Sequence, residues 1–146
     1  MSLVVRRIHE RRAVFEAYLL ALCVVTGLTS WLVPDARARS IISAFPEWAQ
    51  GLWYVTVTLG GALGILGITR RAVDLGLVIE RSALWLLAGL TASYGVASVG
   101  YAGPSSIPAM ATLLAFTGVC VIRIYQINTD LAAIALHVAA QAGDAP

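Results

Sequence analysis

Apolar residues dominate four segments of the chain that contain no charged side chain. They span residues 17–33, 52–68, 83–102 and 107–122. A helix needs about 20 predominantly apolar residues to cross a bilayer, with a range of about 17–25. The third segment meets this length, the first two lie at its lower limit, and the fourth needs a few flanking residues. None shows the period-two alternation of a membrane β-strand, so the pattern predicts four membrane-spanning helices.

Little sequence remains outside these spans. Of 146 residues, 59% are hydrophobic and 12% are charged, whereas charged residues make up about 25% of a soluble domain. We therefore expect an all-α fold, an integral membrane four-helix bundle over residues 17–123. A basic cytoplasmic segment, 1–16, precedes it, and a cytoplasmic helix and tail, 124–146, follow it. Neither flanking segment is long enough for a core of its own.

The basic residues are all arginine, and they are distributed unevenly about the spans. Only Arg37 and Arg39 lie on one side, against eight on the other. The eight are Arg6, Arg7, Arg11, Arg12, Arg70, Arg71, Arg81 and Arg123. The positive-inside rule therefore predicts that both chain ends are cytoplasmic. We expect these eight side chains to lie at the anionic headgroups of the lipid bilayer, where each contributes about 1 kcal/mol.

The first span has an alternative interpretation as a signal peptide. Arginines, an apolar run and the motif Ala36-Arg37-Ala38 resemble the three regions of such a peptide. The apolar run exceeds the usual 7–15 residues, however, and ends in Trp31 and Pro34. These features favour a retained span. In the outer loop that follows, residues 35–45 are expected to form a short helix on the membrane surface.

Small residues recur at four-residue spacing in the second and third spans. The two rows are Thr56, Gly60 and Gly64, and Gly89, Ser93 and Ala97. Lipid provides no hydrophobic drive for helix association, so small residues promote it by letting two backbones approach closely. The rows are therefore candidate helix-packing positions. Two interpretations stay open, namely contact inside the bundle and contact between copies in a homo-oligomer.

The apolar pattern continues beyond the fourth span. Apolar residues alternate at spacings of three and four, as on the seam of a coiled coil. These residues are Ile124, Ile127, Leu131, Ile134 and Val138. The pattern predicts that the last helix extends into the cytoplasm as one long helix with a seam for packing. The alternative is a break at 128–130, where Asp130 would cap a separate helix.

Residue types that carry chemistry are scarce. Ion-coupled transport usually needs an ionisable group inside the membrane, and none of the four predicted spans contains one. His9 and His137 lie outside the spans, and Cys23 and Cys120 are isolated cysteines within them, so no metal-ligand spacing is present. The arginines are explained by topology and do not indicate a nucleic-acid partner. We expect no enzymatic activity and no cofactor.

The stretches 46–55 and 60–67, with the four short spans and the arginine-only basicity, resemble small four-span membrane proteins of actinobacterial bacteriophages, which are holin-like. The nearly neutral tail departs from many holins, whose tails are strongly charged. The resemblance implies a multi-pass protein of the bacterial cytoplasmic membrane that self-associates and opens a lesion. Two alternatives are a non-lytic accessory protein that binds another membrane component, and a small dimeric channel or exporter.

Overall fold

The computed structural model describes residues 14–33, 46–70 and 72–143. Within these ranges the chain is helical, with no strand. The elements are α2 (Val14–Leu32), α4 (Glu47–Thr69), α5 (Val73–Ala102), the 3-10 turn η2 (Gly103–Ser106) and α6 (Ile107–Gly143). The predicted all-α fold is therefore confirmed. The surface helix expected over 35–45 lies outside the described residues, as does the basic segment up to residue 13.

Three of these helices are long and apolar enough to cross a membrane, namely α4, α5 and α6. The apolar part of α2, Glu16–Leu32, is shorter. Many large apolar side chains face outward, among them Trp31, Leu59 and Ile122. Apolar surface of this extent is typical of contact with lipid. The protein is therefore a membrane protein, and a crossing by α2 stays a prediction.

The helices are longer than the apolar segments that predict them. Helix α4 begins at Glu47 and α5 begins at Val73, which shortens the connection between them to three residues, 70–72. Helix α6 continues without interruption to Gly143. The prediction of one long last helix is thus confirmed, and the alternative break at 128–130 is wrong. The cytoplasmic location of its end stays a prediction.

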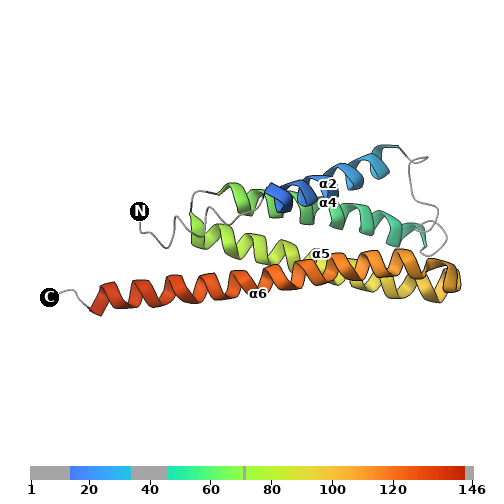
Figure 1. Ribbon diagram of the computed structural model, residues 1–146. Helices are drawn as coiled ribbons and strands as arrows, with labels where there is room; N and C mark the ends of the chain where they lie inside the picture. The colour runs from blue at the N-terminus through green and yellow to red at the C-terminus, as the bar shows by residue number, and fades with distance from the viewer. Residues whose placement is uncertain (1–13, 34–45, 71, 144–146) are drawn as a thin grey trace.

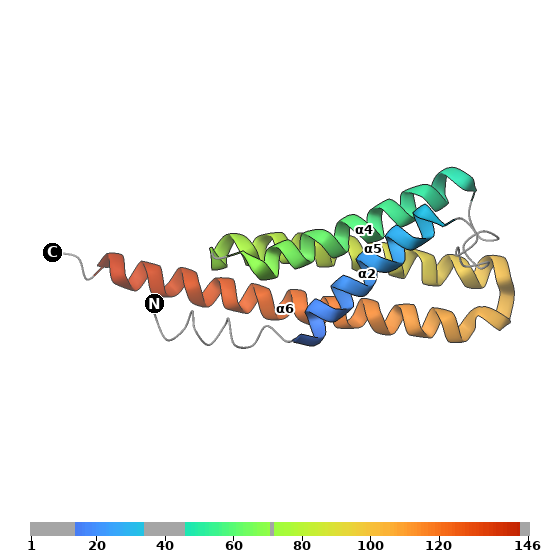
Figure 2. The same ribbon diagram turned by 90° about the horizontal axis from the view of Figure 1, so that it is seen from above.

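Each helix packs mainly against its neighbour in the chain. The extensive interfaces are those of α2 with α4, α4 with α5, and α5 with α6. Helix α2 runs obliquely over α4 and α5, and it lies near α6 only at its first turns (Figure 2). The bundle therefore has three tight seams and one loose seam, between α2 and α6. Helix α6 projects beyond the other three at its C-terminal end (Figure 1).

Glycines on one side of α4 allow close contact with α2. A Cβ atom built on Gly61 would lie 2.7 Å from the carbonyl oxygen of Leu20, and one on Gly64 would lie 2.6 Å from the Leu20 side chain. Real Cβ atoms do not approach other atoms this closely. Glycine at both positions thus lets α2 lie directly against the α4 backbone, as small residues do in membrane helix pairs.

Glycines on another side of α4 face α5. A Cβ on Gly67 would lie 2.7 Å from the amide nitrogen of Glu80, and one on Gly60 would lie 2.8 Å from the Leu87 side chain. Gly60 and Gly64 from the first predicted row are therefore both packing positions within the chain. They contact different helices, because a four-residue step turns about 40° around a helix.

Two clusters form the core. The larger one draws on all four helices toward the end where α4 turns into α5. Its buried members are Leu20, Leu77, Leu84, Leu87, Ala88, Cys120, Ile124 and Ile127. A smaller aromatic cluster lies nearer the other end, where the rings of Trp53 and Tyr94 are tilted at 52° with centroids 4.6 Å apart.

The α5–α6 connection is a tight turn. Gly103 has φ 67° and ψ −160°, a conformation that side chains rarely allow. The hydroxyl of Ser106 donates to the carbonyl oxygens of Ser98 at 3.0 Å and Gly103 at 2.8 Å. These contacts fix α5 and α6 as an antiparallel pair and thereby bring α6 residues alongside the first half of α5.

Candidate functional site

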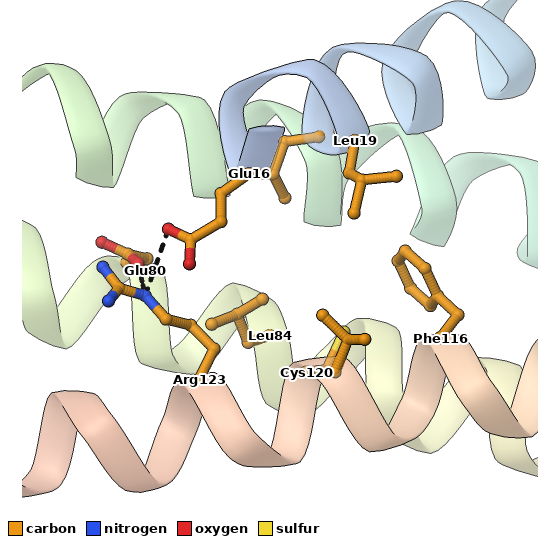
Figure 3. Close-up of a pocket in the computed structure, with 9 residues that line it drawn as sticks. Glu16, Leu19, Glu80, Leu84, Phe116, Cys120 and Arg123 are labelled. Carbon is orange, nitrogen blue, oxygen red and sulfur yellow. Dashed lines mark hydrogen bonds and ion pairs between the residues drawn. The ribbon is translucent and has the colours of Figure 1, made fainter. Parts of the chain in front are cut away.

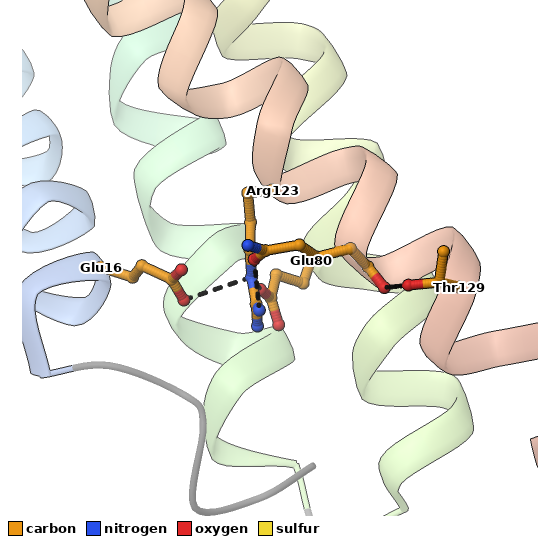
Figure 4. Close-up of polar contacts among 5 residues, drawn as sticks. Glu16, Glu80, Arg123 and Thr129 are labelled. Atoms are coloured by element: carbon orange, nitrogen blue, oxygen red, sulfur yellow. Dashed lines mark hydrogen bonds and ion pairs between the residues drawn. The ribbon is translucent and has the colours of Figure 1, made fainter. Parts of the chain in front are cut away.

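Three ionisable side chains from three helices meet inside the bundle. The Nε atom of Arg123 on α6 donates a hydrogen bond to Oε1 of Glu80 on α5 at 2.9 Å. The same Nε atom lies 3.2 Å from Oε2 of Glu16 on α2. Figure 4 shows the two carboxylates on either side of the guanidinium. We call Glu16, Glu80 and Arg123 the charged cluster.

The charged cluster is shielded from solvent. Arg123 is 6% exposed and Glu80 is 1% exposed, while the side chain of Glu16 is 22% exposed. Isolated charges are costly to bury, and they become tolerable when they are paired and hydrogen-bonded. Arginine suits this position because its planar, delocalised group is more weakly hydrated than an ammonium. The cluster therefore ties α2, α5 and α6 together at one level of the bundle.

Further polar contacts continue from this level along α5 and α6. Nη1 of Arg123 lies 3.4 Å from the side-chain oxygen of Gln126, and the Gln126 carbonyl oxygen accepts a hydrogen bond from Thr129 at 2.7 Å. The Arg81 guanidinium donates to the Asn128 side chain at 3.0 Å. The Arg81–Asn128 contact thus joins α5 to α6 at the end away from the η2 turn, and the other two contacts lie within α6.

The burial of Arg123 corrects the expectation that this residue lies at the lipid headgroups. It follows Ile107 by sixteen residues, which is about 24 Å along a helix, against about 30 Å for the hydrocarbon core of a bilayer. If α6 enters the membrane near Ile107, the charged cluster lies just within the opposite edge. Glu16, Glu80 and Arg123 all lie just outside the four predicted spans, so the prediction that these spans contain no ionisable group is not contradicted. The carboxylates that pair with Arg123 come from α2 and α5. The spacing of residues along the sequence does not reveal this pairing.

A small cavity adjoins the charged cluster. Its volume is about 30 Å³, which is room for about two water molecules. Apolar side chains from α2, α5 and α6 line it beside the three charged ones, and Leu19 of α2 lies across it from Phe116 of α6 (Figure 3). The cavity therefore marks incomplete packing at the α2–α6 seam.

Both cysteines of the chain lie near the charged cluster. Cys120 lines the cavity, and Cys23 packs against the same core cluster, and both thiols are free. Across the described ranges, no group of three or more His, Cys, Asp and Glu residues is placed to hold a metal ion. The charged cluster connects the first turn of α2 to the α5–α6 pair.

The second predicted row, on α5, faces outward. No described residue lies within 4 Å of a Cβ atom built on Gly89, and Ser93 is exposed, with its hydroxyl bonded to the Gly89 carbonyl oxygen at 2.7 Å. Ala97 is half-buried, as is Thr56 of the first row. Gly89 and Ser93 therefore form a shallow, small-residue strip on the outer face of α5, which we call the α5 strip.

The predicted seam on α6 is occupied within the chain. Ile124 is 3% exposed and Ile127 is fully buried, and Leu131 and Ile134 pack against the same cluster. The side chain of Val138 lies outside the described part of the structure. Because the first half of α5 covers this seam, four of its five residues stabilise the protomer.

The remaining predicted arginines have varied positions. Arg70 is exposed at the end of α4, and Arg81 is half-buried through its contact with α6. Arg6, Arg7, Arg11, Arg12 and Arg71 lie outside the described residues. Contact of these side chains with headgroups stays a prediction.

Polar side chains also occupy the interior of the bundle away from the charged cluster. The hydroxyls of Thr91 on α5 and Thr117 on α6 are 2.8 Å apart, and each also bonds to its own helix one turn earlier. Ser30, Gln50 and Ser98 are buried as well. Polar side chains are thus buried at several levels of the bundle, beside the apolar core clusters.

Comparison with known proteins adds no assignment. The sequence matches no protein-family model, and no curated protein or solved structure is significantly similar to it.

Proposed function

We propose that the chain is a self-associating protein of the bacterial cytoplasmic membrane that permeabilises this membrane in a holin-like way. The lesion forms when copies accumulate and associate laterally in the bilayer. The proposal draws on the resemblance to small phage membrane proteins for permeabilisation, and on the α5 strip for self-association. Both chain ends lie in the cytoplasm in this proposal, and the arginines at that side, apart from the buried Arg123, contact anionic headgroups.

The α5 strip is the observation that carries self-association. In lipid, two helices gain van der Waals contact where their backbones come close, and small residues allow this approach. Gly60, Gly61 and Gly64 are not available to a second copy, because they pack against helices of the same chain. Gly89 and Ser93 form a small-residue row whose outer side meets no described residue.

A large side chain in the α5 strip tests self-association. We expect Gly89→Leu with Ser93→Leu to lower energy transfer between labelled copies in vesicles, because two leucines hold the partner backbone away. The matched control is Ala111→Leu with Ala115→Leu, which has the same spacing on the exposed face of α6. Equal loss in both variants, or loss in the α6 variant alone, would show that the α5 strip is not the interface.

Permeabilisation is tested by inducible expression in bacteria with continuous recording of membrane potential. The proposal predicts an abrupt depolarisation after a lag, and a later or absent depolarisation for the α5 double variant. A slow, graded leak from the start of expression would instead favour a small channel or exporter. A defined complex with another membrane protein, without any depolarisation, would favour an accessory role.

A further inference from the structure

We infer that the part of α6 that projects beyond the bundle is a contact surface for a second copy of the chain, which binds it in parallel, α6 against α6. The inference deepens the proposed function, because it names a second contact between protomers. It rests on that proposal for the location of this end of α6 in the cytoplasm. The contact itself is tested apart from permeabilisation.

The projecting part of α6 carries no charge. Residues 131–143 include no Asp, Glu, Lys or Arg, and apart from His137 and Gln141 they are apolar or glycine. Helix α6 has 37 residues, about 55 Å of length, whereas the hydrocarbon core of a bilayer is about 30 Å thick. It extends past the end of α4 and the start of α5, where Arg70 and Asp74 are exposed (Figure 1). This stretch therefore lies in water, where a helix that is apolar on all sides needs other helices to bury it.

Helix α5 covers only one side of this part of α6. Leu131 and Ile134 pack against the core cluster, while Leu136, on the opposite side, is 73% exposed. Exposed residues on that side follow one another at alternating spacings of four and three, which is the pattern of a coiled-coil seam. They are Tyr125, Thr129, Ala132, Leu136 and Ala139. We call these five residues the α6 outer face.

The α6 outer face suits a second copy of itself. The residues that flank it are uncharged and mostly small, namely Gln126, Asn128, Ala133, Ala135 and Ala140. Parallel copies therefore bring no like charges together, and the helices can approach closely. All copies cross the membrane in the same direction in the proposed function, so two α6 helices meet in parallel and in register. Because α6 continues without interruption to Gly143, its end points away from the bilayer and does not lie along the membrane surface.

A second contact extends the assembly. A contact between the same surface on two copies is complete at two protomers. The α5 strip lies on a different helix, so the α6 outer face joins pairs of protomers into the larger assembly that a lesion requires. The contact begins at Tyr125, about 15 Å along the helix from Ala115, so the two double variants proposed above leave it in place.

Disulfide formation between copies in bacterial membranes tests the contact. Ala132→Cys lies on the α6 outer face and Ala133→Cys beside it, and both positions are exposed. Oxygen with copper phenanthroline oxidises the thiols, and the unmodified chain gives the background from Cys23 and Cys120. We expect Ala132→Cys to form the dimer about tenfold faster than Ala133→Cys, because a disulfide needs Cα atoms within about 7 Å. Equal rates, faster reaction at Ala133→Cys, or no dimer in either variant would overturn the inference.

A charge on the α6 outer face provides the second measurement. Leu136→Glu places two carboxylates opposite each other in the contact, and its exposed position leaves the fold of the protomer intact. We expect it to slow dimer formation by Ala132→Cys about tenfold, which corresponds to about 1.4 kcal/mol. The control is Ala72→Glu, which adds a carboxylate at an exposed site at the same end and should leave the rate unchanged. An equal effect of both substitutions, or of neither, would contradict the contact.

The two proposals fail in different ways. Selective dimer formation by Ala132→Cys in cells that keep their membrane potential would support the α6 contact and count against lesion formation. Depolarisation of cells in which Ala132→Cys and Ala133→Cys react equally would support lesion formation and overturn the α6 contact.

Discussion

Replacement of Gly67 by alanine tests the close contact between α4 and α5. A Cβ atom at this position would lie 2.7 Å from the Glu80 amide nitrogen and 2.8 Å from the Gly76 carbonyl oxygen. Both neighbours are backbone atoms, so relief requires a shift of a whole helix rather than a side-chain rotation. Overpacking of this kind costs about 1–3 kcal/mol. Alanine offsets part of this cost, because it favours helix over glycine by up to about 1 kcal/mol.

Gly89→Ala is the matched control, because the same methyl group there meets no described residue. We expect Gly67→Ala to lower the free energy of unfolding by about 1–2 kcal/mol and Gly89→Ala to leave it unchanged or raised. The measurement is reversible unfolding in mixed micelles with increasing mole fraction of sodium dodecyl sulfate. Tryptophan fluorescence follows the transition, since Trp53 packs in the aromatic cluster. Equal unfolding free energies for the two variants would refute the close contact.

Three further substitutions are predicted for the same assay. Arg123→Gln should cost about 3–5 kcal/mol because it removes the guanidinium from a buried pair, whereas Arg70→Gln, at an exposed site, should change stability by less than about 0.5 kcal/mol. Ile127→Ala should cost about 2–5 kcal/mol, because this side chain is fully buried, and Leu136→Ala, at 73% exposure, should cost much less. Thr91→Val should cost about 0.6 kcal/mol through loss of the contact between α5 and α6. Equal effects within either matched pair, or a stabilised Thr91→Val, would contradict the packing described here.

Helix content and the order of helices follow from the sequence because the apolar segments are long and are separated by charged residues or, between the third and fourth, by the turn residues Gly103-Pro104-Ser105-Ser106. The length of the apolar segments alone predicts helices that are shorter than those in the structure. Helix α4 begins at Glu47 and α5 begins at Val73, because helices continue through flanking charged residues such as Glu47, Asp74 and Glu80 beyond their apolar parts. The last helix was predictable over its whole length from the spacing of its apolar residues.

The charged cluster was not predictable from the same pattern. Glu16, Glu80 and Arg123 each lie at the edge of an apolar segment, where an exposed headgroup contact is the simplest interpretation. Their burial results from three helices meeting at one level, and this is a tertiary property. Likewise, four-residue spacing predicts Gly60 and Gly89 to be equivalent helix-packing positions. In the structure, Gly60 is buried against another helix and Gly89 is exposed.

Topology mapping tests the central claim, that the chain crosses the membrane four times with both ends in the cytoplasm. Alkaline phosphatase and green fluorescent protein are fused in turn after Ser40, Arg71, Pro104 and Pro146. The account predicts phosphatase activity only at Ser40 and Pro104, and fluorescence only at Arg71 and Pro146. Phosphatase activity at Pro146, or fluorescence at Ser40, would contradict it.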